Sequence, residues 1–250
     1  MIPFFRKIRK KMADDNKPIQ YMRYAFGEII LVVIGILIAL SINNWNQERV
    51  VKEQNLVILH NLNKEFSENL IELDSSINRF NRVIEGLDKL LTIMRTQDSN
   101  LTEREFDKVL HKTFWTPNWT PSSFVLVELK NSGALSNLKN NNLKTLLFKW
   151  EREFDDMKGS KEGYGQYAGE YIEFLTKNGS VRNLDALSES TKTLQKSTIA
   201  RNNPELLKIP EFENRADNFY FLAVSLRTKF QSLRGIMTDI IEVSITELKQ

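Results

Sequence analysis

The amino-acid sequence predicts an all-α protein in which one N-terminal transmembrane helix continues into a bundle of long helices outside the cytoplasm. Three observations predict this fold: an uncharged apolar stretch near the N-terminus, two long heptad patterns of apolar residues, and the lack of a convincing alternating strand pattern. The expected regions are a basic cytoplasmic tail (1–23), a transmembrane helix (24–45) and an extracytoplasmic, periplasmic α-helical domain (46–250).

Charge is unevenly distributed along the chain. Residues 1–23 hold seven basic and two acidic side chains, residues 24–47 contain a single acid, and residues 48–250 carry 28 basic against 29 acidic groups. The overall charge of +3 therefore comes from the tail, and the large domain is close to neutral. A domain without a basic field is not expected to bind nucleic acid.

The tail pairs apolar residues with cations. Phe4, Phe5, Ile8 and Met12 fall near one face of a helix, and the cations on the other side are Arg6, Lys7, Arg9, Lys10 and Lys11. Such a helix could lie on the anionic lipid of the inner leaflet. The alternative is a plain positively charged flank of a membrane helix, and the sequence leaves both open.

The next segment has the length and composition of a membrane span. Nineteen consecutive uncharged residues separate Glu28 from Glu48, close to the roughly 20 apolar residues that cross a bilayer as a helix. A buried core helix is the alternative, but core helices rarely carry aliphatic residues on every face. Tyr24 and Trp45 mark the two membrane–water interfaces. The basic flank predicts that the helix spans the inner membrane with its N-terminus on the cytoplasmic side.

A cleaved signal peptide is the competing interpretation, since Ala39-Leu40-Ser41 resembles a cleavage site. The region before the apolar run is too long, and the run exceeds the usual 7 to 15 residues, so an uncleaved signal anchor is favoured. Within the span, small or polar residues share one helical line: Gly27, Gly35, Ala39 and Asn43. Small residues let helices approach closely, which predicts self-association through this face and a homo-oligomer.

The N-terminal 46 residues also form a recognisable pattern. They contain MI (1–2), FFRKIR (4–9), YA (24–25), GEIILVVIGILIAL (27–40) and INNWN (42–46). This pattern resembles a family of uncharacterised single-pass membrane proteins of Bacteroidota, and ELKNSGAL (128–135) resembles that family's extracytoplasmic helix-turn-helix. Ser41 and Gln47 depart from the pattern, which usually has Gln and Glu there. The resemblance implies location and a helical fold, but no biochemical activity.

Two heptad seams predict the long helices of the bundle. The first continues from the membrane helix, because no Pro or Gly interrupts residues 36–85, and comprises Leu59, Leu62, Phe66, Leu70, Leu73, Ile77, Phe80, Ile84, Leu87, Leu91 and Met94. The second follows a helix start at Pro210 and comprises Phe219, Ala223, Leu226, Phe230, Leu233, Met237 and Ile240. The two helices are expected to pack antiparallel.

The segment between the seams is predicted to be helical but broken. Thr102 and Glu105 form a capping box, and Ser123 is the expected cap of a short helix closed by Gly133. A helical pattern runs over 143–157 and continues over 164–174, and residues 178–210 are expected to form a mobile linker with one short helix.

The aromatic loop beside these helices is the candidate contact site with a partner protein. Its residues are Phe114, Trp115, Trp119 and Phe124. Tryptophan dominates interface hot spots, so the loop could form a recognition patch. The same residues could instead fold back as a lid on the core, and exposure decides between the two.

The sequence contains few residues that would suggest catalysis. The chain has no cysteine, His60 and His111 are isolated, and no phosphate-binding loop or nucleophile motif occurs. We therefore expect no metal, no cofactor and no enzymatic activity. The favoured function is a membrane-anchored, non-enzymatic interaction or scaffold protein. The alternative is a periplasmic ligand-sensing bundle that signals through a partner, because the 23-residue tail is too short to transmit a signal alone.

Overall fold

The computed structural model describes residues 18–96, 101–114, 118–188, 193–199 and 201–249, and these residues form helices and connecting segments with no β-strand. The chain divides into two compact units, Met1–Val57 and Ile58–Gln250. Helix α2 (Pro18–Thr96) contributes residues to both. The predicted all-α fold, with a long apolar N-terminal helix that continues into further helices, is confirmed.

In the first unit, the described residues belong to α2. This helix contains a stretch that is long and apolar enough to cross a membrane, and none of its most apolar 18 residues is buried. Within the described chain, the stretch is therefore not a core helix, and its aliphatic side chains are exposed on every face. The tail cations Arg6, Lys7, Arg9, Lys10 and Lys11 lie outside the described residues.

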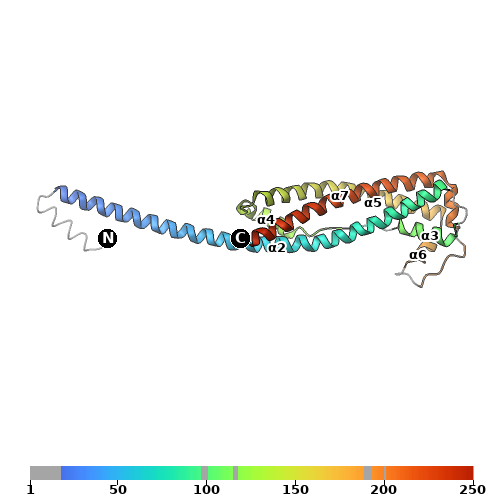
Figure 1. Cartoon of the computed structure of the whole chain (residues 1–250), viewed down its shortest axis with the longest axis horizontal. Coiled ribbons are helices and arrows are strands. Elements are labelled where there is room, and N and C mark those ends of the chain that lie inside the picture. Colours follow the sequence, from blue (N-terminus) through green and yellow to red (C-terminus); the bar gives the residue numbers. More distant parts are fainter. Residues whose placement is uncertain (1–17, 97–100, 115–117, 189–192, 200, 250) are drawn as a thin grey trace. The chain divides into compact units, whose positions relative to one another are not determined.

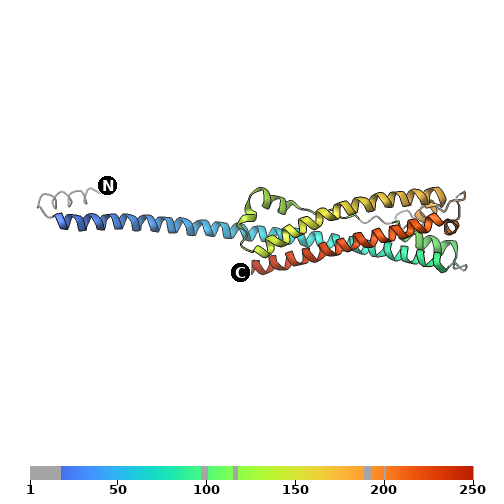
Figure 2. The same ribbon diagram turned by 90° about the horizontal axis from the view of Figure 1, so that it is seen from above.

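The second unit is built on three long helices that run side by side: the later part of α2, α5 (Asn141–Asn178) and α7 (Pro210–Leu248) (Figures 1 and 2). Helices α2 and α5 are parallel. The Phe66 ring packs edge-on against Trp150 at 5.3 Å, and Phe80 packs against Tyr164 at 5.5 Å, so residue numbers rise together. Edge-on aromatic pairs of this kind add to the stability that burial provides.

Helix α7 runs antiparallel to α2, as the two seams predict. The Asn63 side chain donates to the carbonyl oxygen of Ile241 at 3.2 Å, and Arg227 donates to the Asn81 side chain at 3.2 Å. Residue numbers therefore rise on one helix while they fall on the other. The second seam is buried throughout.

The first seam is buried from Leu59 to Leu87 except at Leu70, which is only half-buried, and it then shifts. Leu90 and Ile93 are buried at the end of α2, whereas the predicted Leu91 and Met94 are only half-buried. The reason is a further helix, α3 (Glu103–Lys112), which packs beside this end of α2. It approaches so closely that a Cβ added to Gly86 would lie 2.7 Å from the Lys112 Cβ. The buried face is therefore wider than a two-helix seam.

The two predicted helix caps have different outcomes. The Thr102–Glu105 capping box at the start of α3 is confirmed. The Ser123 prediction is correct in position only: Ser123 is the N-cap residue of α4 (Phe124–Asn131), but its side chain makes no capping hydrogen bond. Glu65 of α2 takes that role, because its Oε2 accepts from the Val125 N–H at 3.1 Å. A short 3-10 helix, η1 (Ala134–Asn137), follows Gly133, whose φ of 72° suits glycine.

A strap without regular secondary structure, residues 118–123, runs back along α2 and leads into α4. The Asn69 side chain holds the strap twice: it donates to the Ser122 carbonyl oxygen at 2.7 Å and accepts from the Ser122 N–H at 2.8 Å. About two turns further along α2, Ser76 donates to the Asn118 carbonyl oxygen at 3.1 Å. Irregular backbone can be buried here because side chains of α2 satisfy it.

The predicted linker, 178–210, is more ordered than expected. Helix α5 passes without a break through Gly159 and Gly163, and α6 (Val181–Asp185) and the 3-10 helix η3 (Asn203–Lys208) follow it. The buried Asn203 side chain donates to Asp107 of α3 at 2.6 Å and accepts from the Ser180 N–H at 2.6 Å. The described parts of the segment are therefore tied to α3 at one end of the bundle.

Candidate functional site

The small-residue face of α2 is open in the described chain. Gly27, Gly35, Ala39 and Asn43 are all exposed. A Cβ added to Gly27 or to Gly35 would meet no atom within 4 Å. Close approach of a second helix therefore stays a prediction of the sequence, compatible with this geometry.

The aromatic loop does not form one exposed patch. Trp119 is only 2% exposed, and its ring packs edge-on against Phe154 at 5.9 Å and against Phe230 at 5.7 Å. Its Nε1–H donates to the Asn69 carbonyl oxygen at 3.2 Å. This corrects the contact prediction for Trp119: the strap folds its indole into the core, as the lid alternative requires.

The other three aromatic residues have separate locations. Phe114 is half-buried and packs against the core, and Trp115 lies outside the described residues. Phe124, the first residue of α4, is 72% exposed. Only Phe124 of the described members is therefore available to a partner.

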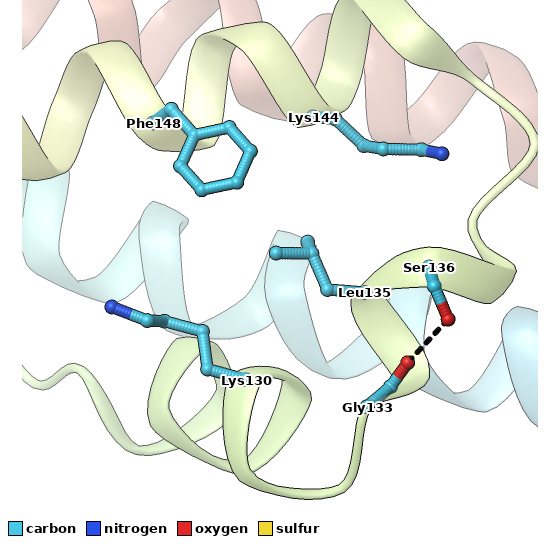
Figure 3. Close-up of a pocket in the computed structure, with 6 residues that line it drawn as sticks. All are labelled: Lys130, Gly133, Leu135, Ser136, Lys144 and Phe148. Carbon is cyan, nitrogen blue, oxygen red and sulfur yellow. Dashed lines mark hydrogen bonds between the residues drawn. The ribbon is translucent and has the colours of Figure 1, made fainter.

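An open groove lies between α4, η1 and α5, and Phe124 is the first residue of α4. We call it the α4–α5 groove; its volume is about 480 Å³, and its lining residues are Lys130, Gly133, Leu135, Ser136, Lys144 and Phe148. Figure 3 shows the side chains of Leu135 and Phe148 directed into the space between the two helices. Phe148 is 54% exposed, so the groove has an apolar centre that water reaches.

Two lysines stand on opposite sides of this apolar centre (Figure 3). Lys130 of α4 donates from its Nζ to Glu151 Oε1 of α5 at 2.6 Å, an exposed ion pair that joins the two helices. Lys144 has no ion-pair partner among the described residues. The groove therefore combines apolar surface with one cation that is already neutralised and one that is not.

The walls of the groove are fixed by buried contacts. Leu126 and Leu129 anchor α4 in the core, and Glu65, itself largely buried, accepts from the Ser122 hydroxyl at 3.0 Å as well as capping α4. Asn140 caps the start of α5 and also donates to Glu247 near the end of α7 at 2.8 Å. A surface on two anchored helices is preorganised for contact.

The residues that line this groove were not among the contact residues predicted from the sequence. The helical pattern over 143–157 predicts one buried face. Of its six apolar residues, Leu146 and Phe154 are half-buried and four are buried: Leu143, Leu147, Trp150 and Met157. Phe148 interrupts that pattern, and an aromatic residue off the buried face of an amphipathic helix is a detectable signal of surface contact. Glu65 is a second such signal. An acidic residue beside an apolar seam needs a buried polar partner, so its presence indicates that another segment packs there.

Ionisable groups elsewhere do not suggest acid–base chemistry in the groove. Burial raises the pKa of Tyr164 and of Tyr171, which keeps both as neutral core hydroxyls. Burial lowers the pKa of His111 on α3, at the other end of the bundle (Figure 1). Across the ranges that the structure describes, no three His, Asp or Glu side chains are grouped to hold a metal ion.

Comparisons with known proteins give one match. No curated protein and no solved structure matches the chain. A model of a family of unknown function, DUF6090, matches residues 28–154, just over half of the chain. The matched segment includes the apolar stretch of α2, the strap and every residue that lines the α4–α5 groove. The match agrees with the predicted membership of an uncharacterised family. The chain belongs to the family of unknown function DUF6090.

Proposed function

We propose that this protein is a membrane-anchored, non-enzymatic interaction protein whose helical bundle contacts a partner protein through α4 and α5. The observation that carries the proposal is the group of exposed apolar side chains on these helices: Phe124, Val127 and Phe148. Exposed aromatic and aliphatic residues on anchored helices are typical of interaction sites.

The proposed location is the inner membrane of a bacterium of the Bacteroidota, with residues 1–23 in the cytoplasm, 24–45 in the bilayer as an uncleaved signal anchor, and 46–250 in the periplasm. The basic flank supports this orientation. A further support is the pair of Trp45 and Arg49, whose guanidinium carbon lies 5.8 Å from the centre of the indole ring. Tryptophan and arginine are both suited to the headgroup region.

Orientation can be tested directly because the natural chain has no cysteine. Single cysteines introduced as Asn16→Cys and Lys149→Cys give one reporter on each predicted side. We expect a membrane-impermeant maleimide to label the Lys149→Cys protein in intact spheroplasts and the Asn16→Cys protein only after lysis. The reverse pattern would overturn the orientation, and labelling of neither protein before lysis would overturn the periplasmic location.

Partner contact can be tested by site-specific photocrosslinking in cells. A photoreactive amino acid at Phe148 should give discrete adducts, and the matched control is Phe221, an exposed phenylalanine of α7. Phe221 lies far along the bundle from the groove, since its neighbour Phe219 packs against Tyr164 and Tyr171. Adducts at Phe221 equal to those at Phe148, or none at either position, would contradict the proposed contact surface.

A second candidate function is the sensing of a small molecule in the bundle, with the signal passed to a partner. The volume of the α4–α5 groove favours it, because ligand pockets usually measure about 300–1,000 Å³. A thermal-shift screen of the detergent-solubilised full chain tests this candidate. A ligand that stabilises the natural protein but not the Phe148→Ala variant would support it, and a screen without such a ligand would count against it.

A further inference from the structure

We propose that the α4–α5 groove binds an acidic amphipathic helix of a partner protein. This inference rests on the proposed interaction function and names the chemistry of the partner. A groove accepts an amphipathic helix when it offers an apolar floor and polar edges that match the flanks of that helix. The floor here is Leu135 and Phe148, and the edges carry Lys130 and Lys144 (Figure 3).

Charge selects among possible occupants. Residues 123–149, which build both walls, contain four lysines and one acid, Glu128. The rest of residues 48–250 carries 24 basic against 28 acidic groups, so the excess of positive charge is local to this surface. Opposite charge on a partner steers association and discriminates against wrong partners. A basic helix is therefore disfavoured, and so is the same surface of a second copy of this chain.

The two lysines are expected to play different parts. Lys130 is held by Glu151, whose carboxylate a partner would have to displace, whereas Lys144 can receive a new carboxylate without such displacement. Lys144 is half-buried, which limits the positions of its side chain. Lys144 is therefore the main electrostatic contact, and Phe148 is the main apolar contact.

The outward face of α4 extends the contact beyond the groove. Val127 precedes Lys130 by three residues, so the two side chains are neighbours on the helix surface, and Phe124 lies one turn before Val127. Both apolar side chains are exposed. An amphipathic helix longer than the groove would cover them as well.

The binding experiment uses full-length protein in lipid nanodiscs and three synthetic 18-residue peptides labelled for fluorescence anisotropy. The first has leucine at helical positions i, i+3, i+4 and i+7, with glutamate on the flanks; the second replaces each glutamate with lysine; the third is a scrambled form of the first. We expect the acidic amphipathic peptide to bind at least tenfold more tightly than the other two, and to weaken as salt rises.

Variants then assign the contact. Phe148→Ala should weaken binding of the acidic peptide roughly tenfold, as for a truncated hot-spot aromatic. Lys144→Gln should weaken it about threefold and flatten the salt dependence, as expected for an exposed charge pair. The matched controls Phe221→Ala and Lys89→Gln, which change exposed side chains outside residues 123–149, should bind as the natural protein does.

Several outcomes would overturn the inference. Equal binding of the basic peptide, or equal loss of binding in the control variants, would remove the charge selection or the site. No binding of any peptide, while photocrosslinking at Phe148 still captures a protein, would remove the acidic helix and leave the proposed function intact. Sodium decanoate that binds in a Phe148-dependent manner, with no peptide binding, would identify the groove as a small-amphiphile site instead.

Discussion

The two parts of helix α2 carry apolar residues in different arrangements. In the apolar stretch of the first unit, aliphatic side chains occupy every face and none of the most apolar 18 residues is buried. In the bundle, apolar side chains follow a stripe, and residues such as Leu62, Leu73 and Phe80 are completely buried. The two parts of this one helix therefore have apolar patterns that suit different environments. An apolar stripe suits a helix bundle, and apolar residues on every face suit lipid.

The largest expected effect comes from placing charge on the apolar cylinder. The double change Ile34→Lys and Ile38→Lys should make membrane insertion less favourable by roughly 5–7 kcal/mol, because each lysine near the centre of a span costs about 2.5–3.5 kcal/mol. Carbonate extraction should then release the protein from membranes. The control is Ile71→Lys with Phe221→Lys, two exposed apolar positions of the bundle. Equal retention of both double variants in the membrane fraction would break the comparison.

The next effect concerns the buried stripe. Phe80 is 0% exposed, and its ring packs edge-on against Tyr164 at 5.5 Å and against Phe230 at 5.2 Å. Phe80→Ala should lower the free energy of unfolding of the bundle by about 3–5 kcal/mol. The measurement is denaturant unfolding followed by circular dichroism in detergent. Phe221→Ala, on the exposed face of α7, should change stability by less than about 0.5 kcal/mol, and a similar loss in both variants would contradict the assigned core.

Two glycines should respond with opposite signs to the same substitution. Gly86→Ala places a Cβ 2.7 Å from the Lys112 Cβ, so α3 must shift, and we expect a loss of about 1–3 kcal/mol. Gly159→Ala, inside α5 with no atom within 4 Å, should stabilise by about 0.5–1 kcal/mol because alanine favours helix. Thermal unfolding measures both. Equal stabilisation by the two substitutions would mean that α3 does not pack against Gly86.

A smaller effect is expected at the cap of α4. Glu65→Ala removes the acceptor for the Val125 N–H and for the Ser122 hydroxyl, which should cost about 1–2 kcal/mol. Ser123→Ala should have no effect, because that side chain makes no capping bond. Amide hydrogen exchange of α4 should rise only in the Glu65 variant. If Ser123→Ala raised exchange and Glu65→Ala did not, the cap would have to be reassigned.

The least perturbing change addresses self-association of the apolar stretch. Gly35→Leu adds bulk to an exposed face where an added Cβ would meet no atom within 4 Å, so the bundle should keep its thermal stability. Crosslinked oligomers in membranes should nevertheless decrease, because the larger side chain blocks close helix approach. Val33→Leu is the control on another face. Unchanged oligomers in the Gly35 variant would refute the predicted association through Gly27, Gly35, Ala39 and Asn43.

The sequence predicted those features that depend on residues close together in the chain. The apolar stretch, the two seams and the Thr102 capping box all follow from periodicity or spacing within a few turns. It did not predict the Glu65 cap of α4 or the strap on Asn69, because these contacts join residues more than 50 positions apart. The shift to Leu90 and Ile93 was missed for the same reason, since it depends on where α3 packs.

The candidate site was only partly predictable. Phe124 was identified by its place in an aromatic loop, but Trp119 in the same loop is buried, because the strap turns its indole toward Phe154 and Phe230. The sequence contains the residues of the α4–α5 groove, yet only the fold brings Leu135 and Lys130 opposite Phe148 and Lys144. Local composition therefore located one residue of the surface, and tertiary packing supplied the rest.

The carboxylate of Glu65 has a mechanical consequence. It projects from α2 and ends on the first turn of α4, so the start of α4 is held at one rotational setting of α2. Adjacent residues of an α-helix differ by about 100° around the axis. A twist of α2 by that angle would withdraw the carboxylate and leave the Val125 N–H without its acceptor. The orientation of α4 therefore depends on the rotation of α2 about its own axis.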